Sequence, residues 1–289
     1  DLDVRIIARP NDPLGHGTAI TGSAVGNGLQ SGSNPGQHTY TNSFAGSAPE
    51  ARLVFQAIGC DQGGTAADFP LNLYNHAYSR GARIHSHSYG GTADGGYYAK
   101  DRDADQFVNT NKEFILLYAA GNYNTPGNVS NNAKNILTVG GFYVDSINQQ
   151  VYARGPTRDG RYKPDILSTA IATNGGGITT TYSSIQYPSG ACQQLTSNPP
   201  YCLVAGTSIA TPNVAGAAAL VREYYITRRN TPNPTAALVK ATILNGGDTL
   251  FNGLPSNDYG WGRMNLSNSL VLNMYWDFGF WDIRTGLTT

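Results

Sequence analysis

The stretch Gly206-Thr207-Ser208-Ile209-Ala210-Thr211-Pro212-Asn213-Val214-Ala215-Gly216 decides the fold, because it places a serine at the start of an apolar, alanine-rich run. Such a run is typical of a helix, and we expect Ser208 at or just inside its N-terminus. Unpaired backbone N–H groups and the helix dipole favour negative charge there, as a nucleophile that builds an oxyanion requires. We expect Pro212 in the first turn, where proline costs no backbone hydrogen bond.

Composition excludes several classes of function. Lys and Arg number 19 and Asp and Glu also 19, so the formal net charge is zero and nothing indicates a nucleic-acid partner or an anionic membrane surface. No apolar run approaches the length of a membrane span. Charged residues make up only 13% of the chain, whereas glycine and tyrosine are abundant. This composition is typical of a secreted, extracellular protein, and 289 residues can bury a sizeable core.

The order of elements predicts an α/β fold. Short β-rich runs alternate with helical stretches, which favours a mostly parallel sheet flanked by helices on both faces. No repeat or break divides residues 1–289, so we predict a single domain. The expected strands lie in 52–58, 82–88, 114–120 and 136–141, the expected helices near 71–79, 101–111, 209–225 and 234–244, and the expected loops in 30–44 and 174–200.

A second motif, Gly15-His16-Gly17-Thr18, lies near the start of the chain and opens a run of small residues with helical character. A lone histidine between glycines is often a turn residue, and a serine before an apolar run is often only a helix cap. Together, however, the two motifs resemble the histidine and serine boxes of the subtilisin-like serine proteases. The resemblance covers most of the chain and implies the three-layer subtilisin-like fold, with Ser208 as nucleophile and His16 as general base.

Further segments carry the same resemblance. Asn122 ends an Ala-Gly-Asn box that in this family supplies a side-chain amide to the oxyanion. Ser88-Tyr89-Gly90 resembles the family segment that pairs with the substrate backbone, and with Ala119-Ala120-Gly121 it is expected to wall a roomy, apolar P1 pocket. His85 and His87 share one face of a strand, which favours packing over a metal site.

The closest similarity within the family is to the oxidatively stable alkaline proteases of bacilli. It is carried by Asn11-Asp12-Pro13, by the stretches 81–85 and 154–165, and by Gly260-Trp261-Gly262-Arg263. It implies an endopeptidase of broad specificity, with no cofactor needed for the chemistry and a structural calcium possible at an unknown site. Members often carry a C-terminal β-barrel domain, which we do not expect in residues 1–289.

The expected triad aspartate is missing from these motifs. In the family it lies on a strand tens of residues before the histidine, but only fifteen residues precede His16, and Asp1, Asp3 and Asp12 lack that context. The same segment would hold interior strands of the sheet. We therefore predict that an N-terminal fragment or a companion chain supplies those strands and the aspartate. The alternative is a non-catalytic structural or binding protein that keeps the fold.

Cysteines and two sequons add expectations about the compartment. Cys192 and Cys202 flank a short Pro-containing loop, which favours a disulfide and an oxidising compartment, with two free thiols as the alternative. Cys60 would then remain as a small buried residue. Asn128 and Asn265 fit the N-glycosylation pattern, which is short and common.

Overall fold

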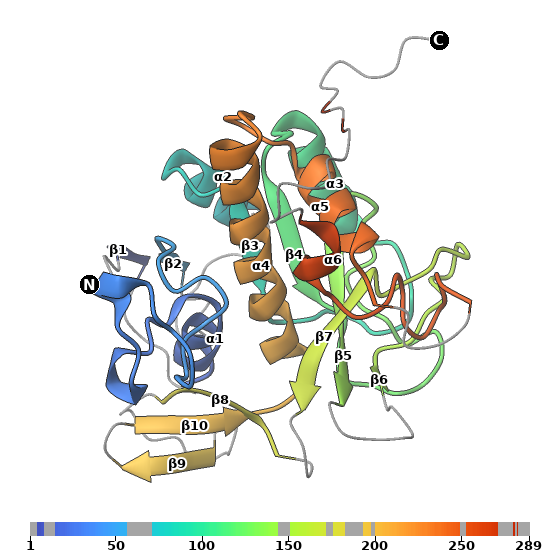
Figure 1. The fold of residues 1–289 in the computed structure, drawn as a ribbon. Coiled ribbons are helices and arrows are strands. Elements are labelled where there is room, and N and C mark those ends of the chain that lie inside the picture. Colours follow the sequence, from blue (N-terminus) through green and yellow to red (C-terminus); the bar gives the residue numbers. More distant parts are fainter. Residues whose placement is uncertain are drawn as a thin grey trace.

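The computed structural model describes residues 5–8, 15–56, 71–143, 151–171, 176–182, 193–197, 200–248, 253–270, 280 and 282. Figure 1 shows a central sheet with helices in front of it and behind it. This arrangement confirms the predicted α/β fold with a mostly parallel sheet. The predictions of a single domain and of absent N-terminal strands are not tested by it.

The central sheet holds the strand order β3-β4-β5-β6, and β7 pairs with β5. The β3–β4, β4–β5 and β5–β7 pairs are parallel, and only the short β6 is antiparallel. Every residue of β4 is buried, as expected for a parallel strand covered on both faces. The strands are β3 (Ile84–His87), β4 (Ile115–Ala119), β5 (Leu137–Tyr143), β6 (Val151–Tyr152) and β7 (Ile166–Ile171).

Two helical layers cover this sheet. On one side α4 and α5 pack against the strands, and on the other side α2 and α3 do so (Figure 1). The four predicted helices are all present, with bounds shifted by a few residues at most. They are α2 (Leu71–Ser79), α3 (Ala99–Thr110), α4 (Thr207–Arg228) and α5 (Ala236–Asn245), and a short α6 (Leu266–Ser269) follows.

A second, smaller unit lies beside the edge strand β3. Here β1 (Arg5–Ala8) and β2 (Val54–Gln56) form a two-stranded parallel sheet that is separate from the central one. Helix α1 (His16–Val25) packs against α4, where the Ser23 hydroxyl donates to Asn213 Oδ1 at 2.7 Å. Two short 3₁₀ turns, η1 (Leu29–Ser31) and η2 (Pro35–Gln37), follow within the predicted loop.

The predicted loop over 174–200 is partly wrong. It contains strands β8 (Ile178–Thr181) and β9 (Gln193–Ser197), which pair with β10 (Pro200–Val204) in an antiparallel sheet of order β8-β10-β9. The sequence hid β8 because its threonines are polar and follow a run of three glycines, although threonine itself favours strands. The hydroxyls of Thr180 and Thr181 donate to the carbonyls of Ala19 and Thr18 in α1, at 2.6 and 2.7 Å. Hydrogen bonds to α1 thus stabilise β8, which lies in a segment that the sequence predicted as a loop.

Three expectations on residue chemistry stay predictions. Cys202 is buried in β10, but Cys192 lies outside the described residues, and so does Cys60, so the disulfide is untested. Asn265 caps α6, and its Nδ2 donates to Asp248 at 3.0 Å, which says nothing about glycosylation there or at Asn128. Within the described part of the chain, no group of three or more His, Cys, Asp or Glu side chains could hold a metal ion, so the calcium site has no location.

Candidate active site

Both candidate catalytic residues lie at helix starts. His16 is the first residue of α1 and Ser208 the second residue of α4, and each helix is preceded by a glycine in the left-handed half of backbone space. Gly206 has φ 109°, and a Cβ there would lie 3.0 Å from the amide of Asn122. Only glycine therefore allows the turn that brings Ser208 and Asn122 together.

Ser208 and Ser88 exchange hydrogen bonds across the site. The Ser208 hydroxyl donates to the Ser88 carbonyl oxygen at 3.0 Å, and the Ser88 hydroxyl donates to the Ser208 carbonyl oxygen at 2.7 Å. The end of β3 and the start of α4 are thereby fixed to each other, although 120 residues separate them in sequence.

Pro212 explains why the second of these bonds exists. It is the sixth residue of α4, beyond the first turn, so the expectation of a cost-free position is wrong. A residue there would normally donate its N–H to the carbonyl of Ser208, and proline has none to donate. Ser88 supplies the missing donor. The serine turn therefore depends on a side chain from β3 as well as on its own helix.

Asn122 is held by Thr207. Its Oδ1 accepts from the Thr207 backbone N–H at 2.8 Å and from the Thr207 hydroxyl at 2.9 Å. Because both bonds use the oxygen, they fix the orientation of the amide and leave its Nδ2 protons available as donors beside Ser208. The Thr207 hydroxyl oxygen also accepts from the backbone N–H of Gly121 at 3.2 Å. This positioning role of Thr207 was not predicted, since a threonine beside a catalytic serine has no sequence signal of its own.

The two predicted pocket walls lie next to each other. Ser88–Gly90 directly follows β3 and Ala119–Gly121 ends β4, and the register pairs His87 with Tyr118 just before them. The carboxyl ends of parallel strands meet at one sheet edge, which is why segments far apart in sequence converge here.

A buried serine lies between these walls. A Cβ at Gly90 would come within 3.2 Å of Ser130 Oγ, and one at Gly121 within 3.0 Å. The Ser130 hydroxyl donates to the carbonyl of Ala120 at 3.1 Å. In the sequence Ser130 stands out only as part of the glycosylation pattern at Asn128, and only the fold brings it close to the two glycines.

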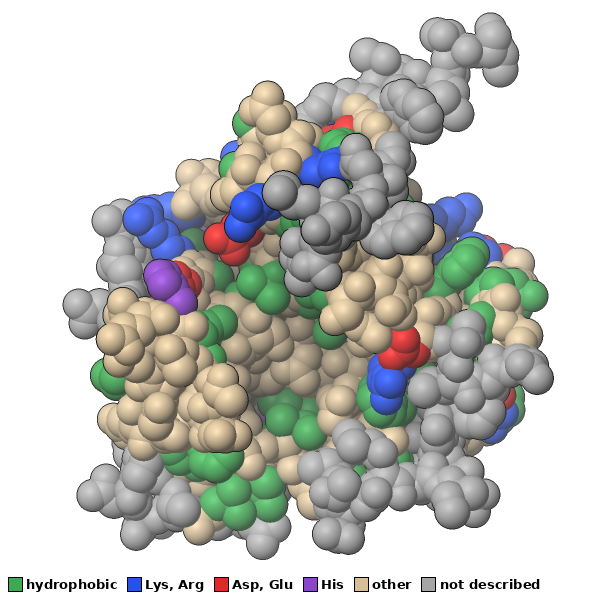
Figure 2. Space-filling view, viewed as in Figure 1, with side chains coloured by type: hydrophobic (Ala, Val, Ile, Leu, Met, Phe, Trp, Pro, Cys, Tyr) green, Lys and Arg blue, Asp and Glu red, His purple; other side chains and the backbone are tan. Residues whose placement is uncertain are grey.

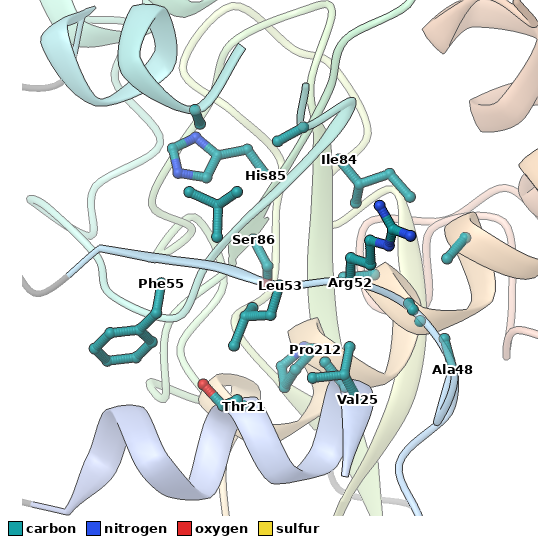
Figure 3. A pocket seen from close by; sticks show the side chains of 18 of the residues that line it. Thr21, Val25, Ala48, Arg52, Leu53, Phe55, Ile84, His85, Ser86 and Pro212 are labelled. Atoms are coloured by element: carbon teal, nitrogen blue, oxygen red, sulfur yellow. The ribbon is translucent and has the colours of Figure 1, made fainter. Parts of the chain in front are cut away.

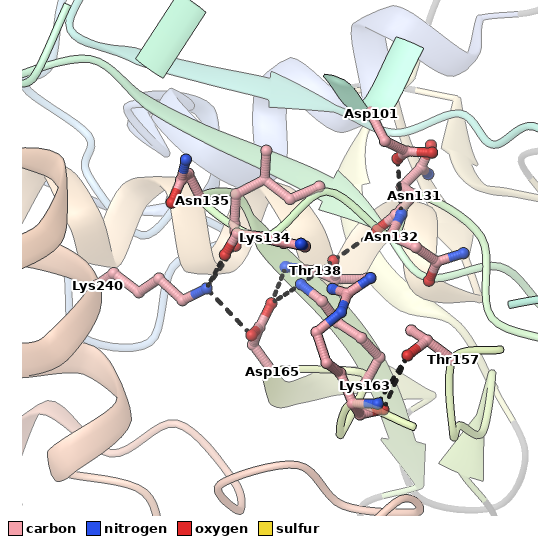
Figure 4. A network of polar contacts seen from close by, with 12 residues as sticks. Asp101, Asn131, Asn132, Lys134, Asn135, Thr138, Thr157, Lys163, Asp165 and Lys240 are labelled. Atoms are coloured by element: carbon pink, nitrogen blue, oxygen red, sulfur yellow. Dashed lines mark hydrogen bonds and ion pairs between the residues drawn. The ribbon is translucent and has the colours of Figure 1, made fainter. Parts of the chain in front are cut away.

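A network of polar side chains supports the loop that carries Ser130 (Figure 4). Asn131 Nδ2 donates to the Ala119 carbonyl at 2.7 Å, and its own carbonyl accepts from the Thr138 hydroxyl at 2.8 Å. The Asp165 carboxylate in turn accepts from Thr138 N at 2.7 Å and from the ammonium of Lys163 at 2.5 Å. Hydrogen bonds thus connect the wall Ala119–Gly121, through Asn131 and Thr138, to the buried Asp165.

The charges in this network perturb one another. Burial lowers the pKa of Lys163 to about 8 despite its bond to Asp165. Burial alone would raise the pKa of Asp165, but the ammonium groups of Lys163 and Lys240 hold it below its usual value. Lys240 lies 3.1 Å from the carboxylate, so both lysines neutralise it.

His85 and His87 belong to an aromatic cluster, as the packing interpretation predicted. The His87 ring stacks on Tyr118 with ring centres 4.1 Å apart, and His87 Nε2 lies 3.1 Å from His85 Nδ1. Tyr89 Oη lies 2.6 Å from His87 Nδ1. Burial lowers the pKa of His85 to about 4, and burial with the neighbouring His85 lowers the pKa of His87 well below its usual value. Both rings are therefore neutral near pH 7.

The predicted site residues thus fall into two groups. Direct contacts join Ser208 with Ser88, and Thr207 joins Asn122 to the same turn. His16 lines a cavity together with Ser88, Tyr89 and Pro212 of the serine helix (Figure 3). The catalytic and substrate-binding roles of these residues remain predictions.

On the face shown in Figure 2, the charged side chains of the described residues do not gather into a patch of one sign. Charged side chains there are scattered over a mostly uncharged surface of described residues. Within the described residues, no helix is both long enough and apolar enough to cross a membrane.

Comparison with known proteins gives several relatives. The chain is 24% identical over 340 residues to the serine protease/ABC transporter B family protein tagD of Dictyostelium discoideum, covering 83% of this chain and 18% of tagD. It is 29% identical over 301 residues to the serine protease AprX of Bacillus subtilis (strain 168), covering 93% of this chain and 63% of AprX. The chain therefore spans less than two thirds of each of these relatives.

Solved structures share the fold. The prenylagaramide maturation protease PagA matches with a TM-score of 0.65 and 21% identity, over 92% of this chain and 85% of its own. The patellamide maturation protease PatA matches with a TM-score of 0.64 and 22% identity, over 92% and 88% of the two chains. The Peptidase_S8 (subtilase) family model matches residues 8–262, and this chain is therefore a member of the subtilase family.

Proposed function

We propose that the protein is a serine endopeptidase that hydrolyses peptide bonds through an acyl-enzyme on Ser208. The observation that carries the proposal is the turn at Ser208, where Thr207 orients the amide of Asn122 and Gly206 leaves room for it. That arrangement places a preorganised donor beside a hydroxyl at a helix start, which suits the oxyanion of acyl transfer.

The chemistry follows from these groups. The Ser208 Oγ attacks the scissile carbonyl carbon while His16 takes its proton, and Asn122 Nδ2 with the Ser208 N–H binds the developing oxyanion. His16 then gives the proton to the leaving amine, and a water molecule releases the acyl group. Because the Ser208 hydroxyl donates to the Ser88 carbonyl in this structure, it gives up this bond when it donates its proton to His16.

The walls of the pocket suggest the substrate. Ser88–Gly90 and Ala119–Gly121 offer small residues, and Ser130 lies between the two glycines. We expect the extended substrate backbone to pair with Ser88–Gly90 and a large apolar P1 side chain to enter between the walls.

His16 needs an aspartate to orient it, and an N-terminal fragment or companion chain is the proposed source. Loss of the triad aspartate lowers turnover about 3 × 10⁴-fold in subtilisin, so full activity depends on that partner. We place the protein outside the cell, where the low charge content, the predicted Cys192–Cys202 disulfide and glycosylation at Asn128 or Asn265 all fit.

The competing function is a structural or binding protein that keeps the fold, the alternative that the sequence motifs leave open. Reaction with a fluorophosphonate, followed by mass-spectrometric mapping, separates the two. The proposal expects an adduct on Ser208 of the folded chain and none on the Ser208→Ala variant. No adduct on the folded chain at neutral to alkaline pH would favour the non-catalytic alternative.

A further inference from the structure

A half-buried lysine lies against the end of the proposed substrate segment Ser88–Gly90. Lys100 is the second residue of α3, and its ammonium donates a hydrogen bond to the side-chain oxygen of Asn131 at 2.9 Å. A Cβ placed on Gly91, the residue that follows the segment, would lie 2.2 Å from Lys100 Nζ. The ammonium therefore occupies the space that a side chain at position 91 would take.

The charge of Lys100 is not neutralised by an ion pair. Burial lowers the pKa of its ammonium, and the carboxylates of Asp101 and Asp94 offset this only in part. Both carboxylates are held by other donors, and Lys100 forms no ion pair in the part of the chain that the structure describes. A cation in the first turn of a helix also meets the positive end of the helix dipole. A residue that breaks these local rules is expected at a functional site.

Asn131 holds the ammonium in this place. Its Oδ1 accepts from Lys100, while its Nδ2 donates to the carbonyl of Ala119 at 2.7 Å and to that of Tyr89 at 3.4 Å. This amide, shown in Figure 4, is thus bonded to both predicted pocket walls. Because the long lysine side chain is already fixed, binding of an anion costs it little further conformational entropy.

The backbone beside the lysine is accessible. Gly90 and Gly91 are exposed, and their backbone groups make no hydrogen bond to another described residue. An extended peptide can therefore pair with this segment. The Ser208 hydroxyl donates to the carbonyl of Ser88, so the peptide bond to be cut lies at the Ser88 end and Gly91 lies at the far end.

The register of this pairing decides which substrate residue meets Lys100. In an antiparallel pair with the P1 residue opposite Ser88, the fourth residue before the cut bond (P4) is opposite Gly91. Residues directly opposite each other project to the same face, with Cβ atoms about 4.5–5.5 Å apart. Since the ammonium takes the place of a Gly91 side chain, it becomes the cross-strand neighbour of the P4 side chain.

We propose that Lys100 is a specificity-determining residue that binds the carboxylate of a glutamate or aspartate at P4 of the substrate. The inference rests on the proposed function for the direction of the substrate, and it adds an acidic residue to the apolar P1 side chain expected there. The lysine supplies the charge that Gly91 lacks, and the glycine leaves room for it.

Peptide binding tests the proposal. The probe is a fluorescent octapeptide of alanine and serine with phenylalanine at its fifth position and glutamate at its second. Anisotropy follows its binding to the Ser208→Ala chain, which leaves it uncut. The comparison peptide carries glutamine in place of glutamate. We expect the glutamate peptide to bind about 3-fold or more tightly. Equal binding of the two peptides, or binding of neither, would overturn the proposal.

A shift of the glutamate by one position tests the geometry. At the third position its side chain projects to the other face of the added strand, away from Lys100. We expect the preference over glutamine to disappear there. A preference of the same size at both positions would show a general attraction to the charges of the chain and would contradict the pairing opposite Gly91.

Matched variants in the Ser208→Ala chain identify the cation. Lys100→Gln keeps a donor but removes the charge, and it should abolish the preference for glutamate. Lys112→Gln removes the same charge from an exposed residue beyond the other end of α3 and should leave the preference intact. Lys100→Glu should favour a peptide with lysine at the second position over the glutamine peptide. Weaker binding of every peptide with unchanged ratios would assign Lys100 a structural role only and overturn the proposal.

Hydrolysis separates this inference from the proposed function. With Ser208 present, kcat/KM for the two peptides should show the same preference as binding. A preference in binding without hydrolysis, and without fluorophosphonate labelling of Ser208, would support recognition by Lys100 and count against the proposed chemistry.

Discussion

The side of the molecule that carries Ser208 and the side that carries His16 differ in how fully they are packed and paired. Around Ser208, β4 is buried throughout and the side chains of Ser88, Thr207 and Asn122 are all engaged. Around His16, the two sheets are separated by a cavity with two unpaired buried oxygens on its wall. The difference indicates that the turn at Ser208 is fixed by hydrogen bonds among described residues, whereas the surroundings of His16 are less tightly packed.

The largest loss of activity is expected when the nucleophile Ser208 is replaced. Ser208→Ala should lower kcat for peptide hydrolysis on the order of 10⁶-fold, the scale known for the serine of subtilisin, because no other group can form the acyl-enzyme. The assay is hydrolysis of a chromogenic peptide by the folded chain together with the fragment or companion chain proposed to supply the aspartate. Activity that survived this change would move the chemistry away from Ser208.

The oxyanion donor should have the next largest effect. Asn122→Ala should lower kcat by about 100- to 1000-fold with little change in KM, because the amide acts mainly on the transition state. Thr207→Val keeps the amide but removes one of its two anchors, so we expect a smaller loss, about 10-fold. Equal losses in the two variants would show that Asn122 acts only through the fold.

The buried histidines set how stability depends on pH. The unfolded chain takes up protons near pH 6.5, whereas His85 does so only near pH 4 and His87 lower still. The unfolded state therefore binds more protons between these values, and stability, full above pH 6.5, falls as the pH drops toward 4. The loss should be on the order of 3 kcal/mol for His85. Urea unfolding of His85→Gln and His87→Gln should show a flatter dependence in each variant, and an unchanged slope would refute this origin.

The smallest effect is expected where Ser88 compensates Pro212. Ser88→Ala should cost about 1 kcal/mol of unfolding free energy, because the Ser208 carbonyl loses its donor. Pro212→Ala restores a backbone N–H four residues after that carbonyl, so Ser88→Ala should cost less in this background. A double-mutant cycle in urea measures the coupling, and strictly additive effects would contradict the exchange of donors.

The sequence predicted more of the structure around Ser208 than of the structure around His16. Apolar runs located β3, β4 and β5, and helix patterns located α2 to α5, because strands covered on both faces are continuous apolar runs and helices have their own sequence pattern. Ser88, Asn122 and Ser208 were chosen from short motifs, and the structure brings their segments together. Nothing local could reveal that Ser88 replaces the donor lost at Pro212, since the two residues meet only in the folded chain.

Other features could not be predicted from the sequence either, because they depend on contacts between distant segments. Thr207 and Ser130 act through contacts with distant segments. Strand β8 looked like a loop because its threonines are polar, and its pairing with β10 and its bonds to α1 decide its conformation. The cavity beside His16 was not predicted, because its position depends on how β2 and β3 are placed in the folded chain.

Trapping of the acyl-enzyme tests the central claim most directly. The chain is mixed with an activated peptide ester at neutral pH, quenched in acid within seconds, and the adduct is mapped by mass spectrometry. The account predicts one acyl group on Ser208, absent from Ser208→Ala and formed about 100-fold or more slowly by Asn122→Ala. An adduct on another residue, or none on the folded chain, would contradict it.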